Sequence, residues 1–312
     1  MNKNTCRSIE QIFEGSTFNK SERKKLAFEN EKLNLFFENG IINYSLIELV
    51  GSPGSGKTQF ALTLCAEQLI KIHKEKKEDI VFYVYFNRTF PIQRLTTIIE
   101  NKLKHNENNY TSYFIDNKKT NTKKFSNTNH IYSEENNLNQ NEEQTNVSSF
   151  KTNNNDIVRN ILKNLYIQKI NDENEFFSLF QKDIHSIIKY NKISLLVIDS
   201  FNSILNGNEN LDSYKKYQLY IKMSLILKQI SYENNIFIIL INSSNINKHY
   251  SDFSFNISDY IINSSCSNTV IIFKKSKKNN EQVRKMVIKC SEFLRMYKTL
   301  TFQITDSGVD AL

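Results

Sequence analysis

The stretch Gly51-Ser52-Pro53-Gly54-Ser55-Gly56-Lys57-Thr58 fits the pattern G-x-x-x-x-G-K-[ST] without a mismatch. Glycines at these positions let backbone N–H groups converge on phosphate oxygens, and the following helix presents its positive dipole end to the phosphates. The pattern predicts that Lys57 reaches the β- and γ-phosphates of a nucleoside triphosphate and that the Thr58 hydroxyl binds Mg²⁺. It therefore predicts a nucleoside triphosphate with Mg²⁺ as the ligand.

The residues on either side of the loop favour a strand-loop-helix unit. The apolar run 46–50 predicts a strand that enters the loop, and residues 59–69 carry apolar side chains at helical spacing. We therefore expect residues 51–58 to bind the nucleotide.

Composition indicates the domain organisation of the 312 residues. From 104 to 156 the chain is mostly Asn, Lys, Glu, Ser and Thr, so this stretch buries too little apolar surface to offset its chain entropy. We predict a disordered insertion there and a flexible leader over residues 1–30. The core is predicted over 31–312; without the insertion, roughly 220 residues remain after the first forty, which is long enough for one α/β core.

The net charge of +8 and the pI near 9.0 are weak indications of a nucleic-acid partner. Lysine is abundant together with Asn, Ile, Tyr and Phe, which all have A/T-rich codons, so coding bias explains much of the basicity. The four cysteines and five histidines lack the spacing of a disulfide scaffold or metal site, and we expect no metal beyond nucleotide-bound Mg²⁺. No apolar run approaches the ~20 residues of a membrane span, so no membrane association is expected.

Strands and helices alternate through most of the core. We predict strands at 80–86, 165–167, 193–198 and 236–241, helices from Pro91 and over 174–190 and 213–232, and a final run of strands at 269–273, 284–289 and 300–304. Alternation implies parallel strands joined by crossovers, and ligands then bind at the carboxyl ends of the strands.

The strand predicted at 193–198 is followed directly by Asp199. Enzymes that bind nucleotides through such a loop place the acid that holds the Mg²⁺ hydration shell at this point. Thr58 and Asp199 are therefore the predicted metal-binding pair.

The order of elements and several short motifs resemble the RecA-type recombinases, and most closely the eukaryotic paralogues of the X-ray-cross-complementing kind. The matching segments are spread along the chain: Leu33–Ile41, Ile47–Leu49, Gly56–Gln59, Phe90–Leu95, Leu195–Ser200 and Phe302–Val309. The resemblance implies an α/β, RecA-like P-loop ATPase core with ATP and Mg²⁺ as cofactors. It also adds Gln59, which follows Thr58 in the family's extended phosphate loop, to the ATP-binding residues 51–58. Its mostly parallel sheet would carry helices on both faces and a C-terminal strand extension. The resemblance further implies a nuclear protein of recombinational DNA repair that binds DNA and related recombinase subunits.

Some positions depart from the family pattern. The glutamate that polarises the attacking water in the family is Asn87 here, and the Asn-Gln pair that senses the γ-phosphate is Asn242-Ser243. The aspartate with which a neighbouring subunit caps the nucleotide falls at Cys290 or Ser291. An amide cannot accept a proton, and loss of a general base typically costs ~10²- to 10⁴-fold in rate. Lys57, Asn87 and Asp199 are thus the candidate catalytic residues, ATP binding is expected, and hydrolysis is left open.

Two segments fall where the DNA-facing loops of this family lie, 205–212 and 243–258. The second contains a mixture of cations and aromatic rings that can contact phosphates and stack on bases: Lys248, His249, Tyr250, Phe253 and Phe255. Inward packing of these rings is the alternative.

Three function classes remain. The first is an ATP-binding recombinase paralogue that assists homologous recombination, and the second is a non-hydrolysing structural adaptor that bridges repair subunits. A small-molecule kinase is a minor third, because such enzymes surround the transferred phosphate with arginines and the chain has only seven.

Overall fold

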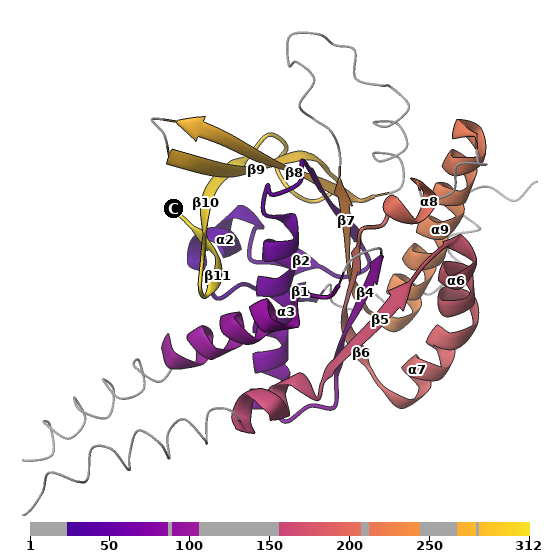
Figure 1. The fold of residues 1–312 in the computed structure, drawn as a ribbon, viewed down its shortest axis with the longest axis horizontal. Coiled ribbons are helices and arrows are strands. Elements are labelled where there is room, and N and C mark those ends of the chain that lie inside the picture. The colour runs from indigo at the N-terminus through magenta and orange to yellow at the C-terminus, as the bar shows by residue number, and fades with distance from the viewer. Residues whose placement is uncertain (1–23, 87–88, 106–155, 207–211, 244–266, 279–280) are drawn as a thin grey trace, which may run out of the picture.

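A nine-stranded sheet lies at the centre of the computed structural model, which describes residues 24–86, 89–105, 156–206, 212–243, 267–278 and 281–312 (Figure 1). In the order in which they lie side by side, its strands are β11 (Gly308–Ala311), β10 (Thr299–Thr305), β9 (Glu281–Ser291), β8 (Thr269–Lys278), β3 (Leu46–Gly51), β7 (Phe237–Ser243), β6 (Ile193–Asp199), β4 (Ile80–Phe86) and β5 (Leu165–Ile170).

The sheet is mostly parallel. Strands β8, β3, β7, β6, β4 and β5 pair in parallel, whereas β8 to β11 pair as an antiparallel meander at one edge. The predicted parallel sheet with a C-terminal strand extension is therefore confirmed. Because the strands β3, β7, β6 and β4 are parallel neighbours, their carboxyl ends meet at the same edge of the sheet.

Helices cover both faces of the sheet (Figure 1). The helices α2 (Glu31–Phe36) and α3 (Lys57–Lys74) and the helical segments 92–105 and 156–162 pack on one face. The opposite face carries α6 (Glu173–Ser178), the π-helical turn η1 (Leu179–Asp183), α7 (Ile184–Tyr190), α8 (Ser203–Asn206) and α9 (Ser213–Asn234).

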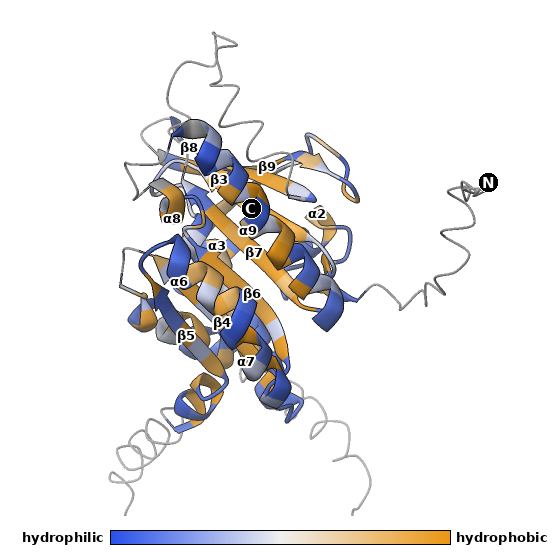
Figure 2. Cartoon of the chain, turned by 90° about the vertical axis from the view of Figure 1, so that its right-hand side faces the viewer, coloured by the Kyte–Doolittle hydropathy of each residue, from blue (hydrophilic) through white to orange (hydrophobic). Residues whose placement is uncertain are grey.

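The strand sequences explain this three-layer arrangement. The central strands are continuously apolar, and alternate residues supply one core on each face: Val81 and Tyr83 join the α3 side, whereas Phe82 and Val84 join the α9 side. Figure 2 shows these strands as hydrophobic ribbons, flanked by helices whose outer faces are hydrophilic. The predicted strands and helices are found at these places, the helix predicted at 174–190 being interrupted by η1.

The folded core begins before residue 31. Strand β1 (Lys25–Leu26) pairs with β2 (Ile41–Ile42), and Leu26 and Phe28 are buried. These residues were predicted to lie in the leader, and they join the core because their apolar side chains pack beside α2 and α3. Most of the predicted insertion, 106–155, lies outside the described residues.

Candidate nucleotide-binding site

The predicted phosphate loop connects β3 to α3, as the strand-loop-helix pattern requires. Gly54 and Gly56 have φ values of 77° and 111°, a left-handed region that favours glycine, and Gly56 is the N-cap of α3. Gly51 is needed for a different reason, because a Cβ there would lie 2.4 Å from the carbonyl oxygen of Phe273 in β8. The glycines therefore allow both the tight turn and its close approach to the neighbouring strand.

Two polar side chains of the loop point into its interior. Lys57 is buried, and its ammonium group donates hydrogen bonds to the carbonyl oxygens of Gly51 (2.6 Å) and Ser52 (3.0 Å). The Ser55 hydroxyl is buried and has no hydrogen-bond partner in the part of the chain that the structure describes. Such an orphaned group in a glycine-lined cradle fits a loop that receives a polar ligand.

Thr58 and Asp199 come together although they lie far apart in the sequence. The Thr58 hydroxyl at the start of α3 donates a hydrogen bond of 2.8 Å to Asp199 Oδ2 at the end of β6. A hydroxyl and a carboxylate oxygen are ligands that Mg²⁺ prefers. Together with the loop, these residues fit ATP with its magnesium ion.

Tyr83 is a member of this site that the sequence analysis missed. Its hydroxyl donates a hydrogen bond of 3.0 Å to Asp199 Oδ2 from the neighbouring strand β4. Burial, reinforced by the nearby carboxylate, raises the pKa of Tyr83 well above its ordinary value, so the phenol stays protonated and remains a donor. Tyr83 thus fixes the orientation of the Asp199 carboxylate.

Gln59 is held by an arginine rather than left free in the loop. Arg94 Nε, on the helical segment 92–105, donates a hydrogen bond of 2.8 Å to Gln59 Oε1. The same guanidinium group donates to the carbonyl oxygens of Thr305, the last residue of β10, and of Asp306 in the turn to β11. Arg94 therefore ties the start of α3 to the C-terminal strands.

Asn242 belongs to a buried network on the α9 side of the sheet. Its amide donates to Glu48 Oε1 (2.6 Å) in β3, and Ser267 donates to Glu48 Oε2 (3.0 Å). Burial raises the pKa of Glu48 to about 7, although hydrogen bonds from Asn242, Ser267 and Tyr220 oppose the shift. The Asn242 oxygen accepts the backbone N–H of Asn202 at 2.8 Å, so both ends of this amide have partners within the protein.

Several predicted site residues lie outside the described residues. These are Asn87 and the five candidate DNA-binding residues, Lys248, His249, Tyr250, Phe253 and Phe255. Of the positions aligned with the capping aspartate, Cys290 is half-buried and the Ser291 hydroxyl accepts the N–H groups of Phe293 and Leu294.

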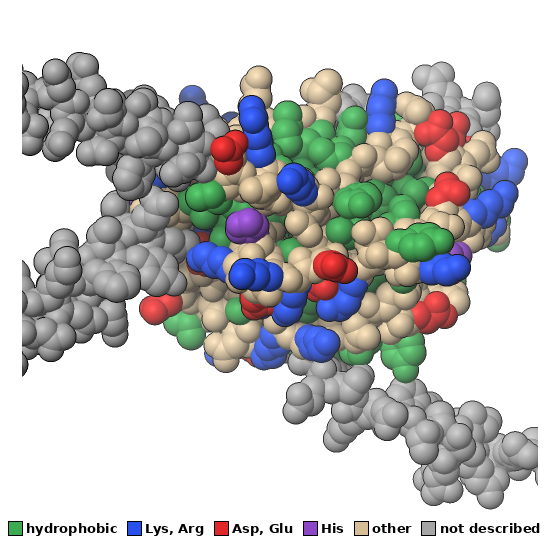
Figure 3. Space-filling model, turned by 90° about the horizontal axis from the view of Figure 1, so that it is seen from below, with side chains coloured by type: hydrophobic (Ala, Val, Ile, Leu, Met, Phe, Trp, Pro, Cys, Tyr) green, Lys and Arg blue, Asp and Glu red, His purple; other side chains and the backbone are tan. Residues whose placement is uncertain are grey.

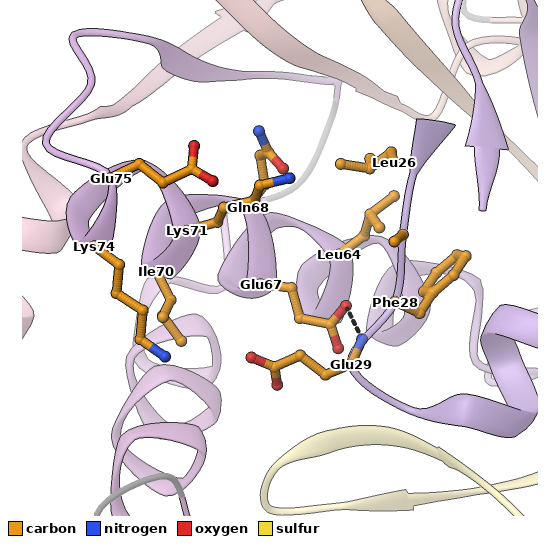
Figure 4. Close-up of a pocket in the computed structure, with 11 residues that line it drawn as sticks. Leu26, Phe28, Glu29, Leu64, Glu67, Gln68, Ile70, Lys71, Lys74 and Glu75 are labelled. Carbon is orange, nitrogen blue, oxygen red and sulfur yellow. Dashed lines mark hydrogen bonds between the residues drawn. The ribbon is translucent and has the colours of Figure 1, made fainter. Parts of the chain in front are cut away.

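A pocket outside the phosphate loop lies beside the helix that follows it. It has a volume of about 320 Å³ and lies between β1 and the later turns of α3, lined by Leu26, Phe28, Glu67 and Lys71 among others (Figure 4). Glu67 accepts the backbone N–H of Glu29 and is paired with Lys102 Nζ at 2.8 Å. No residue of the phosphate loop lines this pocket, so it is not part of the nucleotide site.

On the face seen in Figure 3, Lys and Arg side chains are dispersed among hydrophobic and acidic ones. The net charge of +8 therefore does not form a single basic surface there. None of the helices within the described ranges has the length and apolar character needed to cross a membrane. Within these ranges there is also no group of three or more His, Cys, Asp or Glu side chains that could hold a metal ion.

A comparison with protein families finds a match between residues 20–126 and the family described as Rad51. The matched part includes the phosphate loop, α3, β4 and the helical segment that carries Arg94. No curated protein matches the chain. The fold is that of a RecA-like α/β core, and the match supports a recombinase-type role in DNA repair.

Proposed function

We propose that the chain binds ATP with Mg²⁺ and assists homologous recombination by assembling with related recombinase subunits on DNA. The hydrogen bond between Thr58 and Asp199 (2.8 Å), at the end of a glycine-lined phosphate loop, carries the nucleotide-binding part of this proposal. The family match over residues 20–126 supports the repair role, and placement in the nucleus is the expectation that goes with it.

Each residue of the site has a distinct part in binding. Backbone N–H groups of the loop and the Lys57 ammonium group would hold the phosphates, while the Thr58 hydroxyl and the Asp199 carboxylate would hold the ion, directly or through its waters. Mg²⁺ supplies positive charge that offsets the charge of the phosphates. Tyr83 keeps the Asp199 carboxylate in place by donating to the same oxygen that accepts from Thr58.

Slow hydrolysis follows from the residue at position 87. Asn87 can orient a water molecule but cannot take its proton, so ATP would serve mainly to set the contacts between subunits. DNA-stimulated turnover would require another group or subunit to supply the base.

The edge strand β5 supports assembly with other subunits. Within the described residues β5 pairs only with β4 and therefore lies at one edge of the sheet, where Figure 1 shows it. The strand also exposes two large apolar side chains, Tyr166 (41%) and Ile167 (40%). An open edge of this kind is a template for pairing with a strand of another chain.

The decisive experiment measures nucleotide binding and ATP turnover in the same preparation, with and without single-stranded DNA. The matched variants are Lys57→Ala, which removes the phosphate-binding cation, and Lys71→Ala, which removes a lysine of the same helix distant from the loop. We expect Lys71→Ala and the wild-type protein to bind an ATP analogue in the presence of Mg²⁺ and Lys57→Ala to lose this binding. Absence of nucleotide and DNA binding by the wild-type protein, alone or with a partner subunit, would refute the proposal.

A structural adaptor with an inactive nucleotide site is the second candidate. The observation in its favour is the Asn242 amide, which is bonded to Glu48 and Asn202 and therefore not free to sense a phosphate. This candidate predicts that Lys57→Ala leaves cellular repair of DNA breaks unchanged. A loss of repair in that variant would favour the ATP-binding protein.

A further inference from the structure

The C-terminal hairpin β8–β9 brings two cations to the rim of the phosphate loop. A Cβ built on Gly54 would lie 3.6 Å from Lys275 Nζ, and one built on Gly56 would lie 3.7 Å from Arg284 Cδ. These two glycines belong to the loop itself, so the side chains from β8 and β9 lie directly against it. Neither residue is part of the phosphate-binding sequence pattern.

Strand register explains why both side chains face the loop. Arg284 is paired with Lys275 on β8 and with Phe302 on β10, so the three form one row across the sheet. The preceding row on the same face consists of Phe273 and Met286, which are buried against the α3 side of the core. On β8 and β9 this face therefore changes from apolar in the first row to cationic in the second, next to the phosphate loop, while Phe302 of β10 remains part of the core.

Among the residues that the structure describes, the two cations of this row have no acidic partner. Within the described ranges neither Lys275 nor Arg284 forms an ion pair, and Arg284 bonds only to the neutral Gln282 side chain, at 2.6 Å. The Nε atom of Arg284 is buried and, among the same residues, has no hydrogen-bond partner. A buried guanidinium N–H without an acceptor is costly, and an anion bound in the loop would relieve the cost.

Three cations therefore surround the same small loop: Lys57, Lys275 and Arg284. Their mutual repulsion favours a polyanion at their centre, and a guanidinium group together with an ammonium group is a suitable donor set for phosphate oxygens. The loop also provides the backbone N–H groups that such a ligand needs.

We propose that Lys275 and Arg284 bind the phosphate chain of the nucleotide held by the phosphate loop of the same subunit. This inference rests on the proposed nucleotide binding and adds a second set of phosphate ligands, supplied by the β8–β9 hairpin. Binding of nucleotide in the phosphate loop would therefore fix the position of the β8–β9 hairpin.

The binding test uses Lys275→Gln and Arg284→Gln, with Lys285→Gln as the matched control. Lys285 follows Arg284 on β9 and belongs to the opposite face of the strand, so its substitution removes the same charge without touching the loop. Dissociation constants for ADP and a non-hydrolysable ATP analogue are measured by calorimetry with Mg²⁺. We expect each of the first two variants to bind about tenfold more weakly or worse, and the control to remain within about twofold of the wild-type protein.

A second measurement uses only the wild-type protein. Lysines are acylated with a small amine-reactive reagent with and without ADP, and the modified positions are quantified by mass spectrometry. Bound nucleotide is expected to protect Lys275 and to leave Lys285 unchanged. Because Lys275 is exposed, this readout does not depend on any variant folding correctly.

The outcomes separate this inference from the proposed function. If the wild-type protein binds no nucleotide, both are overturned. If it binds nucleotide while Lys275→Gln and Arg284→Gln bind equally well and Lys275 is not protected, only the two hairpin ligands are refuted. Selective loss of DNA binding in these variants, with nucleotide affinity intact, would also overturn the inference and assign the cations to DNA.

Discussion

Replacing Glu48 with Gln is expected to remove a pH-dependent part of the free energy of unfolding. Glu48 is fully buried in β3, where burial raises its pKa from 4.5 to about 7. A carboxyl group with a higher pKa in the folded state is held more tightly in its protonated form by the folded protein. Its contribution to stability is therefore present at low pH and is lost as the pH rises through the folded pKa.

The magnitude follows from the two pKa values. A pKa shift from 4.5 to about 7 means that Glu48 contributes about 3 kcal/mol less to the free energy of unfolding at pH 8 than at a pH well below 4.5. Between pH 5 and pH 8 the loss is about 2.5 kcal/mol. Glutamine keeps the shape of the side chain and stays neutral throughout. Its oxygen can accept from Asn242 and its amino group can donate to Ser267, so the network is retained.

The assay is chemical or thermal unfolding of the wild-type protein and Glu48→Gln at several pH values between 5 and 8. Relative to the wild-type protein, the variant should gain about 2.5 kcal/mol as the pH rises, or about 5–10 °C in Tm for a domain of this size. Glu78→Gln is the control, because Glu78 is exposed in the connection between α3 and β4. A difference between Glu48→Gln and wild type that stays constant over this range would refute the assignment of a protonated, buried Glu48.

Three further predictions test the site and its support. Asp199→Asn should weaken binding of an ATP analogue about tenfold in Mg²⁺ but not in EDTA, because the substitution removes the charge of the metal ligand. If the variant and the wild-type protein bound the analogue equally well in Mg²⁺, the metal role of Asp199 would be contradicted. Gly308→Ala should lower the free energy of unfolding by about 2 kcal/mol or more, since φ is 109° and the added Cβ would lie 2.3 Å from Thr63 Oγ1; an unchanged Tm would rule out this close approach. Lys102→Met should lower the free energy of unfolding by about 2–3 kcal/mol, because the buried Glu67 loses its cation. If the pairing is correct, the double variant with Glu67→Leu should recover most of this loss in thermal unfolding.

The parts of the fold that depend on local chemistry could be predicted from the sequence. A phosphate loop needs its glycines, lysine and threonine within eight consecutive positions, and a strand buried on both faces needs a continuous apolar run such as 80–86. Asp199 was identified for the same reason, because it directly follows such a run. In each case the signal lies within one short segment.

Side chains that reach the site from distant parts of the sequence could not be predicted in this way. Tyr83 lies in the middle of an apolar run, where sequence alone does not distinguish the residue facing Asp199 from its neighbours in the strand. Arg284 and Lys275 reach the loop only because of the register between β8 and β9, which two lysine-rich strands do not specify. The leader boundary was misplaced because Leu26 and Phe28 pack against α2 and α3 through contacts that composition does not reveal.

The order of the strands determines from which side the nucleotide phosphates can be contacted. Strand β3 lies between β7 and β8, so the loop that follows it has the end of β7 on one side and the β8–β9 hairpin on the other. On the β7 side, Asn242 is bonded to Glu48 and Asn202 and has no free donor to offer without breaking the buried network. On the hairpin side, Lys275 and Arg284 carry charges without acidic partners in the described chain. If the chain responds to bound nucleotide, the response should therefore pass through the C-terminal hairpin, and substitutions at Asn242 should change stability more than nucleotide affinity.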